Sequence, residues 1–392
     1  MQNPFADYLC GHEEDQFRFL RELVLTQSYS RNKTGVDQVG KLIVHELATL
    51  PMSCTRFDQI ELGDHLLFRS PACDTHARQI LLTGHMDTVF PPESGFDWYR
   101  EEEDRVFGPG VIDMKGGLAV AIFALKALHH VGLLSEIPIA LICNSDEEIG
   151  SPTSTELITR EAEKSYFGMV FECGGLQGEV VTGRKGKTGY LLDITGRPGH
   201  AAFAGSGKAS AILELAHKVI AIEQMNDPAR QLVVNVGTVV GGIGPNTVPE
   251  FASAQIDIRY ITGADGRDCD TQLQQIAALN RIPDTSAVLT IASSRKPMEQ
   301  SESNTRLFTW VRHEAEQLGL ALIPELRSGV SDANTIAAAG TPVLDGLGPI
   351  GEYDHSSDEY MIKKSLPERT LLAATAIAAC WERCRDQEGQ AL

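Results

Sequence analysis

The sequence lacks any apolar run that approaches the ~20 residues required to cross a membrane. Its first residues, MQNPFADYLCGHEEDQF, have neither the basic nor the apolar region of a signal peptide. Basic residues are few, 34 against 53 acidic ones, and the net charge is −19. These features argue against a membrane span and against binding to nucleic acid or an anionic membrane. They predict a cytoplasmic chain, with export still open if a leader has been trimmed.

Several common sequence patterns are also missing. The eight cysteines are scattered and form no C-x-x-C motif, which favours free thiols in a reducing compartment. Neither H-E-x-x-H nor G-x-S-x-G occurs, so a single-zinc protease of that type and a serine hydrolase lack support. The GKT at 186–188 has Val181 where a phosphate-binding loop requires glycine, which argues against nucleotide binding.

Apolar runs alternate with helical patterns in the first part of the chain, whose 392 residues suffice for two domains. The predicted strands are 79–84, 137–143 and 168–172. The predicted helices are 13–25, 37–50, 116–132 and 155–165. This alternation predicts an α/β domain with a mainly parallel sheet covered on both faces.

The pattern changes after about residue 182. The predicted order is then strand 188–196, helix 206–225, strands 231–240 and 250–261, helix 266–281 and strand 287–293. This β-α-β-β-α-β order is typical of a ferredoxin-like fold. We therefore expect an inserted domain at 182–296 and a discontinuous catalytic domain formed by 1–181 and 297–392.

The last part returns to the first pattern. A helix is predicted at 302–318, a strand at 321–326, a helix at 332–339 and an apolar segment at 341–348. A final helix should begin near Ser365, where S-L-P-E has a capping-box spacing with proline in the first turn.

Five potential metal ligands stand in separate short motifs, and three of them follow predicted strands. They are His85, Asp113, Glu148, Glu172 and His355. Ligands of parallel sheets bind outside the carboxyl ends of the strands. Two imidazoles and three carboxylates are too few for two separate closed sites but suffice for two metals that share one carboxylate. We expect Asp113 to bridge, with His85 and Glu172 on one metal and Glu148 and His355 on the other.

Two further acidic residues complete the expected site. Glu147, beside Glu148, is a candidate general base that would take a proton from water and give it to the leaving amine. Asp87, two residues after His85, could accept a hydrogen bond from the second ring nitrogen and fix the tautomer.

Taken together, these motifs resemble the co-catalytic zinc aminoacyl hydrolases. That family includes carboxypeptidase G-type glutamate carboxypeptidases, acetylornithine deacetylase, succinyl-diaminopimelate desuccinylase, aminoacylase and several dipeptidases. The resemblance covers nearly the whole chain and rests on GHMDTVF, GPGVIDMKGG, SDEEIGS and HSSDEY in this order. The carboxypeptidase G branch is the most similar, because Glu172 stands where some dipeptidase branches carry Asp. FECGG at 171–175 and SDAN at 331–334 depart from the pattern and leave the substrate open.

The resemblance implies two Zn²⁺ per chain, with Co²⁺ or Mn²⁺ as possible substitutes, and a cis bond between Asp113 and Met114. It also implies that the inserted domain serves as a lid and forms a homodimer. His200, in GRPGHAAF, matches a lid histidine that reaches the partner's active site and stabilises an oxyanion. The residues alone favour an ordinary loop histidine at His200, and the family match reverses that preference.

Four more residues are candidates for holding a substrate carboxylate. Asn246 and Arg259 match family positions with this role, and an arginine fork suits a carboxylate. The alternatives are a turn asparagine and a strand-edge ion pair. Arg295 and Gly329 are further candidates for the same pocket.

The expected function is hydrolysis of an amide next to a free carboxylate, with an N-acyl amino acid or a short peptide as substrate. A strict dipeptidase is one alternative. A metal-bearing binding protein that has lost hydrolysis is another, although the presence of Glu147 argues against it.

Overall fold

The computed structural model describes residues 3–205 and 207–390, which form two compact units. The first unit contains the described residues up to Gly183, residues Gln300–Leu326, and the described residues from Ser331 onward. The inserted unit contains Arg184–Glu299 and Arg327–Val330. Each unit has its own cluster of buried apolar side chains.

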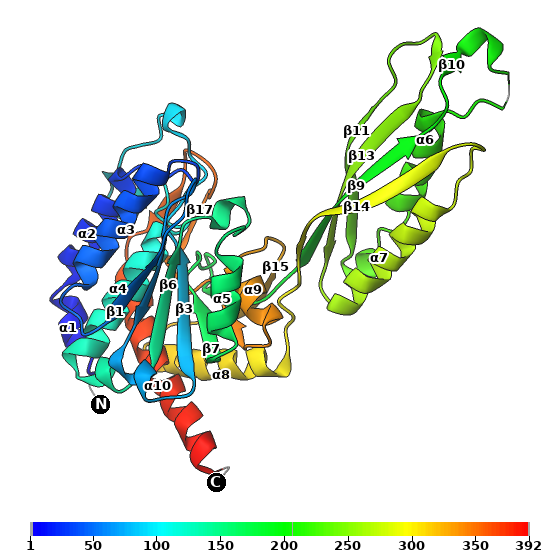
Figure 1. The fold of residues 1–392 in the computed structure, drawn as a ribbon. Coiled ribbons are helices and arrows are strands. Elements are labelled where there is room, and N and C mark those ends of the chain that lie inside the picture. The colour runs from blue at the N-terminus through cyan, green and yellow to red at the C-terminus, as the bar shows by residue number, and fades with distance from the viewer. Residues whose placement is uncertain (1–2, 206, 391–392) are drawn as a thin grey trace. The chain divides into compact units, whose positions relative to one another are not determined.

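A six-stranded mixed sheet forms the centre of the first unit, in the order β1-β2-β6-β3-β7-β16 (Figure 1). Its strands are β1 (Ser53–Phe57), β2 (His65–Arg69), β6 (Ile139–Asn144), β3 (Gln79–His85), β7 (Ser165–Val170) and β16 (Val343–Leu344). The last four are parallel, whereas β1 and β2 add an antiparallel edge. Every residue of β3 and β6 is buried, as expected for strands covered on both faces.

Helices cover this sheet on its two faces. The helices of the unit are α1 (Ala6–Cys10), α2 (Glu13–Leu25), α3 (Lys33–Leu47), α4 (Lys115–His130), α5 (Thr155–Ala162), α8 (Glu302–Gln317), α9 (Asp332–Ala338) and α10 (Ser365–Gln390). Helix α4 is apolar almost all round because it packs between the sheet and helices α2 and α10. Helices α5 and α9 pack on each other and on β7.

Two smaller sheets complete the unit. One pairs β8 (Glu179–Arg184) with β15 (Ile323–Arg327). The other has the order β17-β18-β5-β4, with strands Gly351–Glu352, Tyr360–Ile362, Arg105–Phe107 and Arg100–Glu101. The second sheet joins residues near 105 to residues near 360, and it therefore brings the C-terminal motif next to the segment that carries Asp113.

The inserted unit follows the order predicted for a ferredoxin-like fold. Its elements are β9 (Gly186–Thr195), α6 (Ala211–Glu223), β11 (Val233–Gly241), β13 (Phe251–Tyr260), α7 (Gly263–Ala278) and β14 (Ser286–Arg295). The sheet order is β11-β13-β9-β14, with antiparallel neighbours throughout. Both helices pack on the face formed by alternate residues of β9, namely Tyr190, Leu192 and Ile194. A short β10 (Gly199–His200) pairs with β12 (Thr247–Val248).

The expected fold class is confirmed, and the differences concern the limits of some elements and strands that were not predicted. The predicted helix at 206–225 begins at Ala211, where the Ser210 side chain caps it, and residue 206 lies outside the described residues. Strands β1 and β2 were not predicted. Among the described residues, no helix combines the length and the apolar character needed to cross a membrane.

One buried lysine of α6 ties the two helices of the inserted unit together. The Lys218 ammonium donates to the carbonyl oxygens of Ile276, Ala277 and Leu279 at 2.7, 3.0 and 3.0 Å. It also lies 2.9 Å from Glu214 Oε1, and both side chains are almost fully buried. Lys218 therefore satisfies carbonyl groups at the end of α7 that the helix itself leaves unpaired.

Candidate metal centre

Three of the predicted ligands follow neighbouring strands of the main sheet. His85 is the last residue of β3, the Glu147–Ile149 turn follows β6, and Glu172 lies two residues after β7. These strands are parallel and adjacent, with β3 between the other two. Their carboxyl ends therefore meet at one edge of the sheet, which places the three side chains together.

The other two predicted ligands come from loops far apart in the sequence. Asp113 lies just before α4, and the Asp113–Met114 peptide bond is cis, as the resemblance implied. His355 lies between β17 and β18 with a left-handed backbone (φ 59°). All five predicted ligands belong to the first unit.

The two oxygens of Asp113 face two different histidines. His85 Nε2 lies 3.0 Å from Asp113 Oδ1 and 3.6 Å from Glu172 Oε1. His355 Nε2 lies 3.2 Å from Asp113 Oδ2 and 3.2 Å from Glu148 Oε2. The side chains thus divide into two groups that share one carboxylate, and the groups are the same as those expected from the sequence.

The spacing of these donor atoms fits tetrahedral zinc. Ligand atoms at ~2.0–2.1 Å from a tetrahedral ion lie about 3.3 Å apart. The four contacts above, at 3.0–3.6 Å, lie on both sides of that spacing. In addition, Glu148 Oε1 is buried and has no hydrogen-bond partner among the described residues, which leaves a carboxylate oxygen free for a cation.

The electrostatics of the cluster also require positive charge. Burial, and then the charge of Asp113, raises the pKa of Glu148 to about 8 and that of Glu172 to about 7. Hydrogen bonds to Asp113 and Glu148 raise the pKa of His355 to about 11. Three carboxylates packed so closely cannot all ionise without a counter-charge. A divalent cation held by these residues would supply that charge, and the donor set fits such a cation.

Glu147 lies beside the ligands and is half buried. Its carboxylate, an atom of His85 and an atom of Glu172 all lie within 4.8 Å of one another. Asp354, which the sequence analysis did not single out, forms a similar group with Asp113 and His355. Its position directly before His355 was the only available signal.

Asp87 is fully buried and supports two parts of the site. Its carboxylate accepts hydrogen bonds from Ser30 Oγ at 2.7 Å and from the backbone N–H groups of Glu147 and Glu148 at 3.3 Å each. His85 Nδ1 lies 3.0 Å from the Asp87 backbone oxygen and 3.4 Å from its carboxylate. The nearer acceptor for the imidazole is therefore the backbone carbonyl, whereas the carboxylate holds the turn that carries Glu147.

Two buried carboxylates near the site were missed by sequence reasoning. Asp332, at the start of α9, accepts hydrogen bonds from Asn144 Nδ2 at 2.7 Å and Ser151 Oγ at 2.5 Å. These donors stand on either side of the Glu147–Ile149 turn. Glu359 binds the backbone of the loop that carries Asp113. Glu359 belongs to the same short motif as His355, whereas no sequence pattern links Asp332 to the site.

Within the inserted unit, His200 and Asn246 are close neighbours. Strands β10 and β12 pair His200 with Thr247, and the Ala201 N–H donates to the Asn246 backbone oxygen at 2.9 Å. Both residues are exposed, and the His200 ring packs against Phe203. They lie at the end of the sheet where β9 ends and β13 begins, as Figure 1 shows for β10.

Arg259 and Arg295 lie at the opposite end of this sheet. The strand register places Lys187 between them, opposite Arg259 on β13 and Arg295 on β14. The Arg259 guanidinium donates to Asp257 at 2.7 and 3.3 Å, which corresponds to the ion-pair alternative. Gly329 accepts a hydrogen bond from Arg184 Nη1 at 2.9 Å through its backbone oxygen. The four candidate substrate-binding residues are thus not gathered in one place within the unit.

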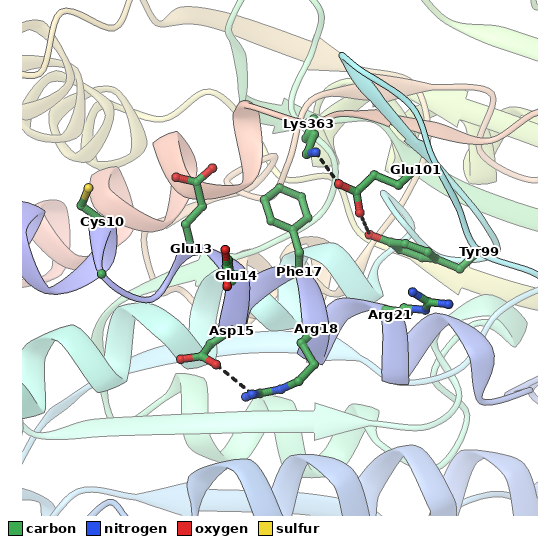
Figure 2. A pocket seen from close by; sticks show the side chains of 11 residues that line it. Cys10, Glu13, Glu14, Asp15, Phe17, Arg18, Arg21, Tyr99, Glu101 and Lys363 are labelled. Atoms are coloured by element: carbon green, nitrogen blue, oxygen red, sulfur yellow. Dashed lines mark hydrogen bonds and ion pairs between the residues drawn. The ribbon is translucent and has the colours of Figure 1, made fainter.

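A separate cavity of about 790 Å³ lies on the first unit beside α2 (Figure 2). Several of its charged side chains contact other residues of the lining. Arg18 pairs with Asp15, and Lys363 pairs with Glu101. Arg21 stacks over the Tyr99 ring. None of the predicted site residues lines this cavity, and its contacts fasten α2 to β4 and to the start of α10.

Comparisons with known proteins identify a family that matches most of the chain. The model of peptidase family M20/M25/M40 matches residues 81–379. Carboxypeptidase G2 of Pseudomonas sp. (strain RS-16) is 28% identical over 370 residues, which cover 91% of this chain and 87% of that protein.

Solved structures share the fold at low sequence identity. Aminopeptidase PepT of Bacillus cereus ATCC 10987 superposes with a TM-score of 0.77 at 20% identity, over 94% of this chain and 99% of that one. The metallo-carboxypeptidase Sso-CP2 of Sulfolobus solfataricus superposes with a TM-score of 0.70 at 16% identity, over 93% of this chain and 98% of that one.

Proposed function

The chain belongs to peptidase family M20/M25/M40, and from this membership we propose a dizinc hydrolase that cleaves an amide or peptide bond next to a free carboxylate. The substrate class is an N-acyl amino acid or a short peptide. The similarity to carboxypeptidase G2 over 91% of the chain favours carboxypeptidase-like or deacylase chemistry.

One observation carries this proposal. Asp113 presents one oxygen to His85 and the other to His355, each at 3.0–3.2 Å. A carboxylate with an imidazole on each side has the arrangement required to bridge two metals. His85 and Glu172 would hold one ion, and Glu148 and His355 the other.

Zinc bound by these residues would supply Lewis-acid charge and lower the pKa of a water from ~15.7 to about 7. Glu147 is the residue placed to move the proton. Its carboxylate lies within 4.8 Å of donor atoms of His85 and Glu172. The Asp87 carboxylate holds the Glu147 backbone, so the general base is kept in place while it accepts a proton and returns it to the leaving amine.

We also propose that each site is completed by a second copy of the chain. The separation of the candidate residues in the inserted unit supports this view. His200 pairs with Thr247, four residues before β13 begins at Phe251, whereas Arg259 lies eight positions beyond Phe251 along that strand. At ~3.3–3.4 Å per residue these positions are roughly 27 Å apart. One inserted unit therefore does not offer both groups to one small substrate, but two copies can.

A substrate panel tests the reaction class. The full chain would be assayed with Zn²⁺, Co²⁺ or Mn²⁺ against dipeptides, N-acetyl amino acids, N-succinyl amino acids and acyl-glutamates. Release of an amino acid from the acylated substrates supports a deacylase or carboxypeptidase. Activity on dipeptides alone indicates a strict dipeptidase. Bound metal without turnover on any member of the panel indicates a binding protein.

Substitution of the proposed base tests the mechanism. Glu147→Gln should keep the fold and the metal but lower kcat by about 10²–10⁴-fold, which is the usual contribution of a general base. The matched control is Glu156→Gln, an exposed glutamate on α5, which should leave kcat unchanged. If metal-loaded Glu147→Gln protein turns over substrate at nearly the parental rate, Glu147 is not the general base.

A further inference from the structure

The loop before α4 is held by a carboxylate from the far end of the chain. Glu359 is fully buried, and its Oε1 accepts hydrogen bonds from the Ile112 N–H at 2.9 Å and the Asp113 N–H at 3.2 Å. Its Oε2 accepts one from the Gly110 N–H at 3.0 Å. Three N–H groups that belong to no helix or strand are therefore satisfied by one side chain.

The hydrogen bonds of Glu359 reach Asp113, whose carboxylate lies between His85 and His355. One of the three donors is the backbone N–H of Asp113 itself. Four residues before Glu359, the His355 imidazole lies 3.2 Å from the Asp113 carboxylate. A single short segment thus contacts both the main chain and the side chain of Asp113.

The cost of burying Glu359 argues that the contact is specific. An ionised carboxylate is expensive to bury unless hydrogen bonds compensate for lost water. Here three backbone donors offset part of that cost, and all three lie in the Gly110–Asp113 loop. The loop has the left-handed Gly110 (φ 81°) and needs a fixed anchor to hold one geometry.

We propose that Glu359 is a positioning residue that holds the Asp113 carboxylate in its bridging orientation. This inference rests on the proposed dizinc function. A metal site requires its ligands to be held within about 0.5 Å of the productive geometry. Glu359 meets this requirement through the loop backbone, without contact with the metals or the substrate.

Two variants and one control test the assignment. In Glu359→Gln, one acceptor oxygen becomes an amide donor that faces backbone donors, while the volume is kept. In Glu359→Asp, the charge is kept but the reach is shorter by one methylene. The control is Asp358→Asn, which neutralises the exposed neighbouring carboxylate.

The readouts are direct metal binding and protein stability. Zn²⁺ stoichiometry and affinity would be measured by competition with a chromogenic chelator, and the Co²⁺ absorption spectrum would report ligand geometry. Thermal unfolding of the metal-free protein would report the fold. We expect Glu359→Gln to bind both ions about 10–100-fold more weakly, with an altered Co²⁺ spectrum. Glu359→Asp should be intermediate, and Asp358→Asn should match the parent.

The outcomes separate this inference from the proposed function. If the parent binds no pair of divalent ions, the proposed function fails, and this inference fails with it. If the parent binds two ions and a folded Glu359 variant binds them with parental affinity and spectrum, only the positioning role is overturned. If neither Glu359 variant folds, Glu359 is a residue of fold stability, which also overturns the positioning role.

Discussion

Complementation between two inactive variants tests whether each site uses two chains. Glu147→Gln removes the proposed base, and His200→Ala removes the proposed oxyanion donor. Loss of one such donor typically lowers kcat by about 10²–10³-fold, so each homodimer should be nearly inactive. In a mixed dimer, the metal site of the His200→Ala chain keeps Glu147 and receives His200 from its partner, whereas the other site has both defects.

The expected recovery follows from symmetry. A purified mixed dimer has one intact site out of two and should show about half of the parental rate. Random pairing makes about half of the dimers mixed, so a co-expressed mixture should show about a quarter. If His200 acts in its own chain, every site has one defect, and no recovery above the homodimers is possible.

The inserted unit supplies an internal control for this experiment. Arg259 pairs in register with Lys187, three residues after the first residue of the unit. It lies roughly 27 Å along β13 from the His200 end. We expect Arg259 to serve the site of its own chain, so Arg259→Ala should not complement Glu147→Gln. Activity that recovers when Glu147→Gln is paired with Arg259→Ala, but not when it is paired with His200→Ala, would be the opposite result. That result would refute the assignment of Arg259 to the site of its own chain and of His200 to the site of the partner chain.

Further predictions concern stability and the support of the site. Chelation of metal should lower the unfolding temperature of the first unit by about 5–10 °C in differential scanning fluorimetry, because an ion at 100 times its Kd stabilises by ~2.7 kcal/mol. An unchanged unfolding temperature would show that bound metal does not stabilise the folded first unit. Lys218→Met should destabilise the inserted unit by about 3–5 kcal/mol in urea unfolding, because Glu214 loses its ion-pair partner while buried and three carbonyl groups lose their donor. A smaller loss in the double variant with Glu214→Gln checks the contribution of the ion pair. Asp87→Asn keeps the backbone carbonyl that faces His85, so we expect kcat to fall about 10–100-fold with metal content retained. If a metal titration showed that this variant binds less metal, the main role of the Asp87 carboxylate would instead be to orient the His85 imidazole.

The sequence predicted those parts of the site that depend on strand ends. His85, Glu148 and Glu172 follow buried apolar runs, and parallel pairing brings the ends of such runs together. The ferredoxin-like order of the inserted unit was equally visible, because β9 alternates buried and half-buried residues along its length.

Other features depend on tertiary contacts that no local pattern reveals. Strand β1 is largely exposed and β2 has only five residues, so neither gives a strong apolar signal. The hydrogen bonds of Glu359 and Asp332 join segments 181–249 positions apart. For Arg259 the sequence left substrate binding and a strand-edge ion pair open, and its guanidinium contacts Asp257 on the same strand.

The interrupted first unit has a consequence for biosynthesis. The inserted unit is nearly continuous in the chain, so a ribosome delivers it whole, whereas His355 and Glu359 emerge long after Asp113. At ~5–20 residues per second, the stretch from Gly183 to Glu359 takes about 10–35 s to synthesise. During that interval the early ligands are exposed without the segment that closes around Asp113. The ion assigned to Glu148 and His355 must therefore wait until translation is nearly finished, and a nascent chain stalled before residue 355 should hold at most one zinc.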